Sequence, residues 1–158
     1  MTDKPASLPV RPKDLEWLAE ALKLSEALSE APALESLLQS FPAISLEDWP
    51  AGADILREGE RGEDFFVVYR GRLSVWRRAA EAPAREIGSL APGDFFGELG
   101  YLLKSARSAT VRADSQCRVF RFPVQEFAAL LKRFQVFELW VKQVAYKRIE
   151  RMFFDGAR

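Results

Sequence analysis

Short apolar runs, separated by glycine and proline, are the feature that most restricts the fold of this chain. They follow one another over residues 43–122, and most of the nine glycines lie in or between them. Because β-branched and aromatic residues favour strands and glycine favours turns, each run is a candidate strand. The candidates are residues 44–49, 53–57, 64–69, 71–78, 85–90, 109–113 and 117–122. Many short strands are typical of a β-sandwich or β-barrel, and the small residues 79–84 are predicted to form a hairpin tip.

Helical periodicity replaces this pattern on both sides of the β region. Leucines recur three or four apart from Leu15, and Pro32 is placed to begin a second helix. Pro123 is placed to begin a third helix, and a longer one is predicted from about Phe134. The N-terminal helices either cap the β region or, since the first is long, dock a partner or a second copy. The chain therefore divides into a flexible leader over 1–12, N-terminal helices over 13–42, the β region over 43–122 and two C-terminal helices over 123–155.

The composition excludes several classes of function. The chain has no histidine, which removes the commonest general base and transition-metal ligand, so we expect neither an enzyme nor a metal protein. Lysine plus arginine and aspartate plus glutamate number 23 each, so no net charge attracts the chain to nucleic acid or to an anionic membrane. The N-terminus has no signal-peptide pattern, and no apolar run approaches the ~20 residues of a membrane span. We therefore expect a cytoplasmic protein.

Two further features have ordinary explanations. The single cysteine, Cys117, lies in an alternating strand-like run, which predicts a buried thiol, with a redox role as the alternative. The last predicted helix has a basic side, for which favourable interaction with the helix dipole is the simpler explanation and membrane or nucleic-acid contact the alternative. That side consists of Lys142, Lys147, Arg148 and Arg151.

Residues 95–111 have the composition of a small pocket for a phosphate and a sugar. Gly97 stands where a short helix is predicted to begin, so a ligand could approach its backbone. Glu98, if buried and ionised, requires hydrogen-bond donors such as sugar hydroxyls. Arg107 can bind two phosphate oxygens at once, and Ser108 with the N–H of Ala109 could complete the cradle. Taken alone, the glutamate and the arginine would more often form a salt bridge or a solvated pair.

These residues resemble the phosphate-binding cassette of the cyclic nucleotide-binding domain family, whose pattern is Phe-Gly-Glu-Leu, a short helical turn and Arg-Ser/Ala-Ala. The chain has Phe96-Gly97-Glu98-Leu99 and Arg107-Ser108-Ala109, with supporting matches over residues 57–63, 69–73 and 90–94. The resemblance implies a jelly-roll β-barrel with flanking helices. The chain departs from the usual Ala, Leu and Pro of the cassette at Gly100, Tyr101 and Ala106, positions that bear on packing of the short helix.

The resemblance also implies a role for each cassette residue, with no metal or other cofactor. Glu98 would bind the ribose 2′-OH; Arg107, Ser108 and the Ala109 amide would bind the cyclic phosphate; and Gly97 and Leu99 would shape the backbone. Relatives that prefer cGMP often carry threonine at the position of Ser108, so cAMP is the expected ligand and cGMP the alternative. An aromatic or apolar residue of the last helix often closes over the base in this family, and we predict Phe153, or else Phe154, for that role. The alternative is that both only pack on the barrel or on a second subunit.

The function predicted from these residues is that of a cyclic mononucleotide sensor. It would relay binding to an effector protein through movement of its terminal helices, with a homodimer through the C-terminal helix as a further expectation. The alternative function is that of a scaffold or interaction protein with a vestigial nucleotide pocket. A transcription factor similar to catabolite activator is not expected, because seven residues follow Arg151 and a DNA-reading helix-turn-helix needs more.

Overall fold

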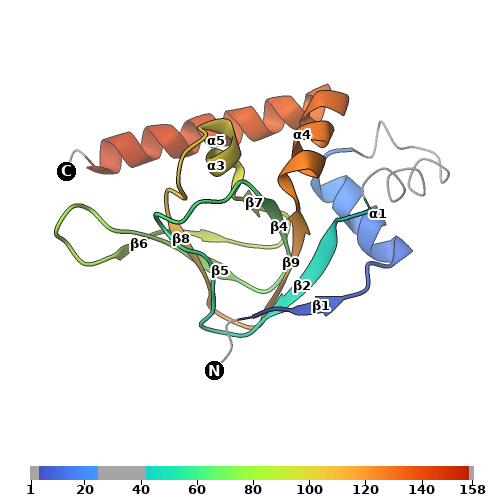
Figure 1. Ribbon diagram of the computed structural model, residues 1–158, viewed down its shortest axis with the longest axis horizontal. Coiled ribbons are helices and arrows are strands. Elements are labelled where there is room, and N and C mark those ends of the chain that lie inside the picture. Colours follow the sequence, from blue (N-terminus) through green and yellow to red (C-terminus); the bar gives the residue numbers. More distant parts are fainter. Residues whose placement is uncertain (1–3, 25–41, 157–158) are drawn as a thin grey trace.

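The structure is a computed structural model that describes residues 4–24 and 42–156, the last four of these by their backbone only. Two antiparallel sheets pack face to face, and helices cover one side of the molecule (Figure 1). The five-stranded sheet has the order β1 (Ala6–Leu8), β2 (Ser45–Trp49), β9 (Cys117–Phe122), β4 (Phe65–Arg70) and β7 (Phe95–Phe96). The four-stranded sheet has the order β3 (Asp54–Leu56), β8 (Thr110–Ala113), β5 (Leu73–Arg77) and β6 (Arg85–Leu90).

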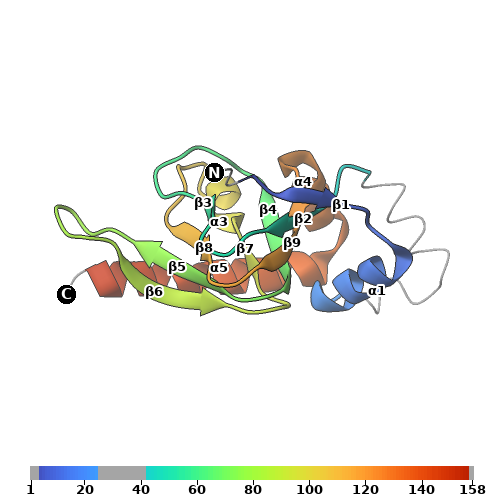
Figure 2. The same ribbon diagram turned by 90° about the horizontal axis from the view of Figure 1, so that it is seen from below.

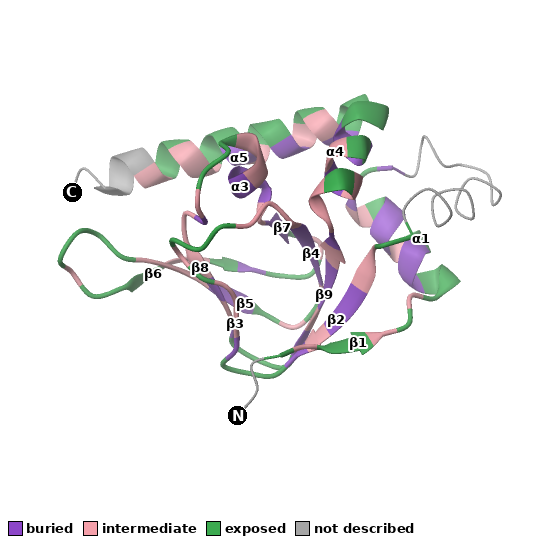
Figure 3. Ribbon diagram, viewed as in Figure 1, coloured by how far each residue is buried: buried purple, intermediate pink, exposed green. Residues whose placement is uncertain are grey.

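The five-stranded sheet is buried on both faces, which explains the continuous apolar run of β4. Phe66 and Val68 point between the two sheets, where they join one apolar cluster. Phe65 and Val67 point to the opposite face and join a second cluster with the helices. Because side chains alternate along a strand, only a sheet covered on both sides requires apolar residues at every position. The buried colouring of β4 and β9 in Figure 3 follows this arrangement.

Four helices complete the described part of the chain. They are α1 (Pro12–Ala21), α3 (Glu98–Leu102), α4 (Val124–Arg133) and α5 (Gln135–Gly156). The long α5 runs along the molecule beside the sheets, as Figure 2 shows from a second direction. Phe65 stacks on Phe127 of α4 with ring centroids 4.1 Å apart and meets Phe137 of α5 edge-on, so β4 fixes both helices.

The predicted fold class, mainly β with flanking helices and a jelly-roll arrangement, is confirmed, here as two packed sheets. Each of the seven predicted strand segments contains a strand. The leader predicted as flexible over 1–12 instead contains β1, which pairs antiparallel with β2, and the start of α1. This pairing depends on a distant strand and has no local sequence signal. The second N-terminal helix, predicted from Pro32, lies outside the described residues.

Helix α1 packs on the outer face of the five-stranded sheet. Its Leu15 and Leu18 are buried in the core, and Trp17 lies 4.6 Å from the ring of Tyr69. Asp14 is also buried and accepts hydrogen bonds from the Arg11 backbone N–H (2.8 Å) and from the Tyr69 hydroxyl (2.7 Å). The apolar face of α1 is therefore used by the core, which favours the capping role over the docking of a partner.

Asp14 makes the attachment of α1 dependent on pH. Burial raises the pKa of its carboxyl, but the hydrogen bonds from Arg11 and Tyr69 outweigh burial, so the pKa is lowered from its ordinary value of 3.8. A lowered pKa in the folded state contributes stability above the unfolded pKa, and this contribution is lost as pH falls through the folded pKa.

We expect Asp14→Asn to lower the free energy of unfolding by about 1–2 kcal/mol at pH 7, because charged acceptors form the stronger hydrogen bonds. The difference from wild type should be smaller at pH 3 than at pH 7, because pH 3 lies below the ordinary carboxyl pKa of 3.8 and the unfolded chain then binds a proton. Urea denaturation at the two pH values measures both differences. A difference that stays constant or widens at pH 3 would contradict an ionised Asp14.

Candidate functional site

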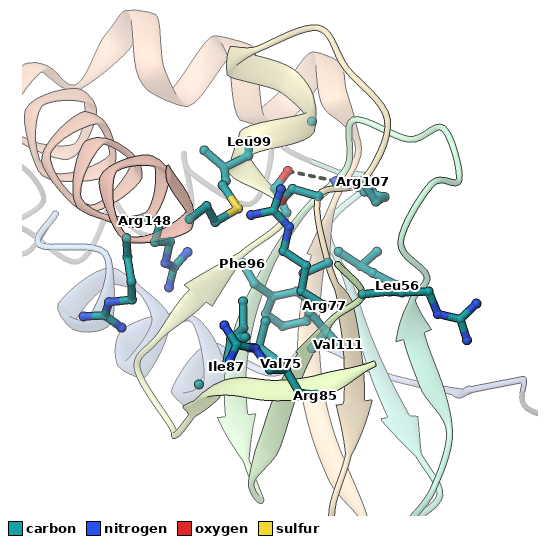
Figure 4. A pocket seen from close by; sticks show the side chains of 18 of the residues that line it. Leu56, Val75, Arg77, Arg85, Ile87, Phe96, Leu99, Arg107, Val111 and Arg148 are labelled. Atoms are coloured by element: carbon teal, nitrogen blue, oxygen red, sulfur yellow. Dashed lines mark hydrogen bonds between the residues drawn. The ribbon is translucent and has the colours of Figure 1, made fainter. Parts of the chain in front are cut away.

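A cavity of about 520 Å³ opens between the β5–β6 hairpin, the segment from β7 to β8, and α5. Figure 4 shows side chains from all three around it, with Val75 and Ile87 from the hairpin, Leu99 from α3 and Arg148 from α5. Its volume lies within the range of small-molecule sites, which is roughly 300–1,000 Å³. All six predicted site residues of the cassette line this one cavity: Gly97, Glu98, Leu99, Arg107, Ser108 and Ala109.

Gly97 caps α3 in a conformation that other residues adopt with strain. Its φ is +89°, in the left-handed region, and a Cβ atom at this position would lie 2.6 Å from the carbonyl oxygen of Asp64. A Cβ on Gly100 would meet the carbonyl oxygen of Gly62 and lie 2.9 Å from Nη1 of Arg107. Gly100, where the family usually has alanine, therefore allows the segment that contains Gly62 to lie close to α3.

Arg107 is a buried cation held by backbone carbonyl groups. Its side chain is 6% exposed and donates to the carbonyl oxygens of Gly97 (2.8 Å) and Asp64 (3.0 Å). Its backbone N–H donates to Glu60, and its carbonyl accepts from Gly59. Burial lowers the pKa of the guanidinium, although the nearby Asp64 carboxylate acts in the opposite direction. Within the described residues Arg107 forms no ion pair, so it faces the cavity as a positive charge without a paired anion.

Glu98 forms its ion pair with Arg148 of α5 and not with Arg107. Its carboxylate, in a residue that is 1% exposed, accepts a hydrogen bond of 2.7 Å from Nη1 of Arg148. Nη2 of Arg148 donates to the carbonyl oxygen of Phe95 at 2.8 Å, and the guanidinium lies 5.0 Å from the Phe95 ring centre. The salt bridge between Glu98 and Arg107 that the sequence left open as the simple alternative is therefore absent.

The role of Arg148 was missed from the sequence, which placed it only on the basic side of the last helix. A signal existed, because Arg148 follows the buried Val141 by seven residues and the buried Ala145 by three. Those intervals place it on the apolar face of the helix. A lone arginine on such a face requires a buried partner, and Glu98 is the acidic residue that lines the cavity beside it.

A second network missed from the sequence holds the Asp64 segment. Arg121 of β9 donates to the Asp64 carboxylate at 2.8 Å and lies 3.4 Å from a carboxylate oxygen of Glu47. Burial lowers the pKa of Arg121, but these two carboxylates outweigh burial and raise it. The network holds Asp64 in place just before β4, and the carbonyl oxygen of Asp64 accepts a hydrogen bond from Arg107. Arg121 therefore positions Arg107 although Arg121 does not line the cavity.

The remaining predicted residues have plain outcomes. Burial raises the pKa of the Cys117 thiol to about 11, so the cysteine is the buried thiol that the sequence predicts. The side chain of Phe153, predicted to close over a base, lies outside the described residues.

In the part of the chain that the structure describes, no cluster of three or more histidine, cysteine or acidic residues could hold a metal ion. No helix of this part is long and apolar enough to cross a membrane.

Comparisons with known proteins agree with this geometry. The model of the cyclic nucleotide-binding domain family matches residues 46–134. The mouse potassium/sodium hyperpolarization-activated cyclic nucleotide-gated channel 3 is 32% identical over 109 residues, which are 69% of this chain and 13% of the channel. The regulatory domain of Toxoplasma gondii PKA with cAMP aligns with a TM-score of 0.68 at 25% identity, over 84% of this chain and 48% of that one.

A solved cyclic nucleotide-binding domain from Methylobacillus flagellatus covers more of the fold, with a TM-score of 0.72 at 14% identity over 94% of this chain and 86% of that one. At this identity the likeness concerns the fold alone. Because the family model covers more than half of the sequence, the chain belongs to the cyclic nucleotide-binding domain family. It spans only a small part of the channel and less than half of the PKA chain.

The backbone at Gly97 can be tested against a matched glycine. Gly93 has a similar φ of +94°, but no atom lies within 4 Å of the place that its Cβ would occupy, whereas Gly97 has the Asp64 oxygen at 2.6 Å. We expect Gly93→Ala to cost about 1 kcal/mol of unfolding free energy, and Gly97→Ala to cost at least about 1 kcal/mol more because of the additional clash. Urea denaturation measures both, and equal losses would contradict the close contact at Gly97.

Proposed function

We propose that the protein is a sensor of a cyclic mononucleotide, with cAMP as the expected ligand and cGMP as the alternative. The observation that carries the proposal is the buried guanidinium of Arg107, which faces the cavity without a paired anion, among the described residues, beside the buried carboxylate of Glu98. A cyclic phosphate would supply the anion, and a ribose hydroxyl would supply a donor. The family membership supports the same ligand class.

Each cassette residue has a role in this proposal. Arg107, the Ser108 hydroxyl and the Ala109 amide would bind the cyclic phosphate, since all three residues line one part of the cavity. Glu98 would accept a hydrogen bond from the ribose 2′-OH, which would compete with the hydrogen bond that Glu98 accepts from Arg148. Gly97 would leave room for the sugar, and Leu99 would cover it. In this proposal the ligand is bound and released unchanged.

The relay to the terminal helices is supported by the contacts of α3 and β7. Tyr101 meets Phe127 of α4 edge-on at 5.3 Å, and Phe95 meets Trp140 of α5 at 4.8 Å. The Glu98–Arg148 ion pair joins the same region to a later turn of α5. A ligand shifts a conformational equilibrium only through different affinities for the two states, and a ribose that binds Glu98 acts directly on this pair.

The outer side of α5 is the surface that a partner would read. Val136, Leu139 and Tyr146 are 62%, 60% and 70% exposed on it. The exposed stripe is visible along α5 in Figure 3. We propose that an effector protein, or a second copy of this chain in a homodimer, binds this side when the ligand changes the position of α5.

We expect cAMP to bind in a one-to-one ratio without metal, and linear AMP to bind far more weakly. Arg107→Ala should weaken binding at least about a hundredfold, because removing one partner of a buried charge pair costs about 3–5 kcal/mol. Glu98→Ala should weaken it about ten- to a hundredfold. Isothermal titration calorimetry measures these affinities. Arg118→Ala is the control, since Arg118 pairs with Asp48 away from the cavity.

Two outcomes of this titration would overturn the proposal. Wild-type affinity in Arg107→Ala would show that the phosphate is held elsewhere. A folded wild-type protein that binds no cyclic nucleotide would favour the second candidate function, a scaffold that uses its exposed α5 side and retains only a vestigial pocket.

Hydrogen exchange tests the relay separately. With cAMP we expect added protection in residues 95–111 and also a change of protection in residues 123–154, because both C-terminal helices contact the cassette. Arg148→Gln keeps a hydrogen-bond donor but removes the charge that holds α5 to Glu98, so it should reduce the cAMP-dependent change in α5. Protection confined to residues 95–111 in the wild type would leave a passive nucleotide carrier without a relay.

A further inference from the structure

The outer end of the cavity carries more positive charge than a cyclic mononucleotide can use. Six arginines line the cavity, against one carboxylate, that of Glu98. The chain as a whole has equal numbers of basic and acidic residues, so this imbalance is local. Arg107 and Arg148 belong to what we call the inner end of the cavity, where they contact Gly97 and Glu98. The outer arginines are Arg77, Arg78 and Arg85 on the β5–β6 hairpin and Arg151 on α5.

The fold brings the outer arginines together from two elements that are far apart in the sequence. The β5–β6 hairpin and the C-terminal part of α5 project toward the same end of the molecule in both views (Figures 1 and 2). Val75 and Arg77 alternate with Trp76 along β5, and so share the face that lines the cavity (Figure 4). Arg77 pairs in register with Arg85. Like charges placed directly opposite on two strands destabilise a sheet, so this pair has a cost that a bound anion would reduce.

Two of the outer arginines have no carboxylate partner among the described residues. The side chains of Arg77 and Arg151 form no ion pair or hydrogen bond within the described residues. Glu58 lies at the start of the hairpin loop, where its carboxylate accepts from the backbone N–H of Arg78. Glu86 is in register with Trp76 and so shares its face of the hairpin, the face opposite to that of Arg77. Even if Glu58 compensates Arg78, the guanidinium groups of Arg77 and Arg151 remain without a paired carboxylate among the described residues.

We propose that the outer end of the cavity is a second phosphate subsite, so that the site prefers a nucleotide with two phosphates. This rests on the proposed function, because the first phosphate occupies the cradle of Arg107, Ser108 and Ala109. A cyclic mononucleotide has one phosphate and fills the inner end only. A cyclic dinucleotide is a compact ligand whose two phosphates are held apart by a ring, and the volume of about 520 Å³ extends to both groups of arginines. Guanidinium groups bind phosphate oxygens in pairs, which suits them to this subsite.

The test is a calorimetric titration of the full chain with cAMP, cGMP, cyclic di-AMP, cyclic di-GMP and the linear dinucleotide pApA. We expect a dinucleotide to bind at least about tenfold more tightly than cAMP, since each charge-assisted hydrogen bond contributes a factor of this order. Tighter binding of a cyclic than of the linear dinucleotide identifies the cyclic form as the ligand. The reverse order identifies the linear form and retains the second subsite.

Variants locate the second phosphate. The double variant Arg77→Gln with Arg151→Gln should weaken dinucleotide binding at least about tenfold and change cAMP binding by less than about threefold. Arg72→Gln is the control: it removes the same charge from an exposed residue just before β5 that does not line the cavity. Circular dichroism confirms that each variant is folded.

Three outcomes would contradict the second phosphate subsite, and one of them would also contradict the proposed function. If cAMP binds and no dinucleotide binds more tightly, the subsite is absent and the proposed sensor function stands. If the double variant weakens cAMP and dinucleotide equally, the arginines attract any anion by long-range charge, and the subsite is again absent. If the folded protein binds neither class, the cradle itself is wrong and the proposed function fails with it.

Discussion

The structure depends on one buried cation. Arg107 lies at the centre of the cassette, and its guanidinium ties the Gly97 turn to the Asp64 segment through two carbonyl oxygens. Removing a charge from water is costly unless polar groups surround it, and neutral carbonyl groups compensate only in part. The lowered pKa of Arg107 expresses the remaining cost. An anion in the cavity would reduce that cost, so the pocket is built with a deficit of negative charge.

The need to surround the Arg107 guanidinium with backbone groups explains the glycines around the site. A Cβ added to Gly62, Gly97 or Gly100 would lie 3.0, 3.3 or 2.9 Å from the Arg107 guanidinium and would crowd it. The segments can therefore close around the guanidinium only because three side chains are missing. Arg121 donates to the Asp64 carboxylate and so holds the segment that contains Asp64 in place. The binding geometry is thus fixed by backbone packing on one side chain and not by a row of polar side chains.

Local pattern predicted seven of the nine described strands, and the resemblance to a family predicted the cassette, but neither predicted the partners of these elements. The apolar run of β4 and the alternation of β9 are local signals, and so is a glycine before an acidic helix start. Strand β1 pairs with a strand beyond α1, and Glu98 and Arg148 are 50 positions apart in the sequence. The sequence shows that an arginine lies on the apolar face of a helix. It does not show which of 23 acidic residues meets it.

The attachment of α5 differs between its two halves, and this limits how the helix can move. Phe137, Val141 and Ala145 are buried in the core, so the first half is held by apolar packing against β4 and α4. Beyond Ala145 the described contact with the cassette is the pair of hydrogen bonds from Arg148 to Glu98 and to the Phe95 carbonyl. Apolar packing resists displacement over a broad area, whereas an ion pair can exchange one partner for another. Under the proposed function, a ligand that bound Glu98 would therefore act on the second half of α5, and the helix would bend or release near Ala145 while its first half stayed in place.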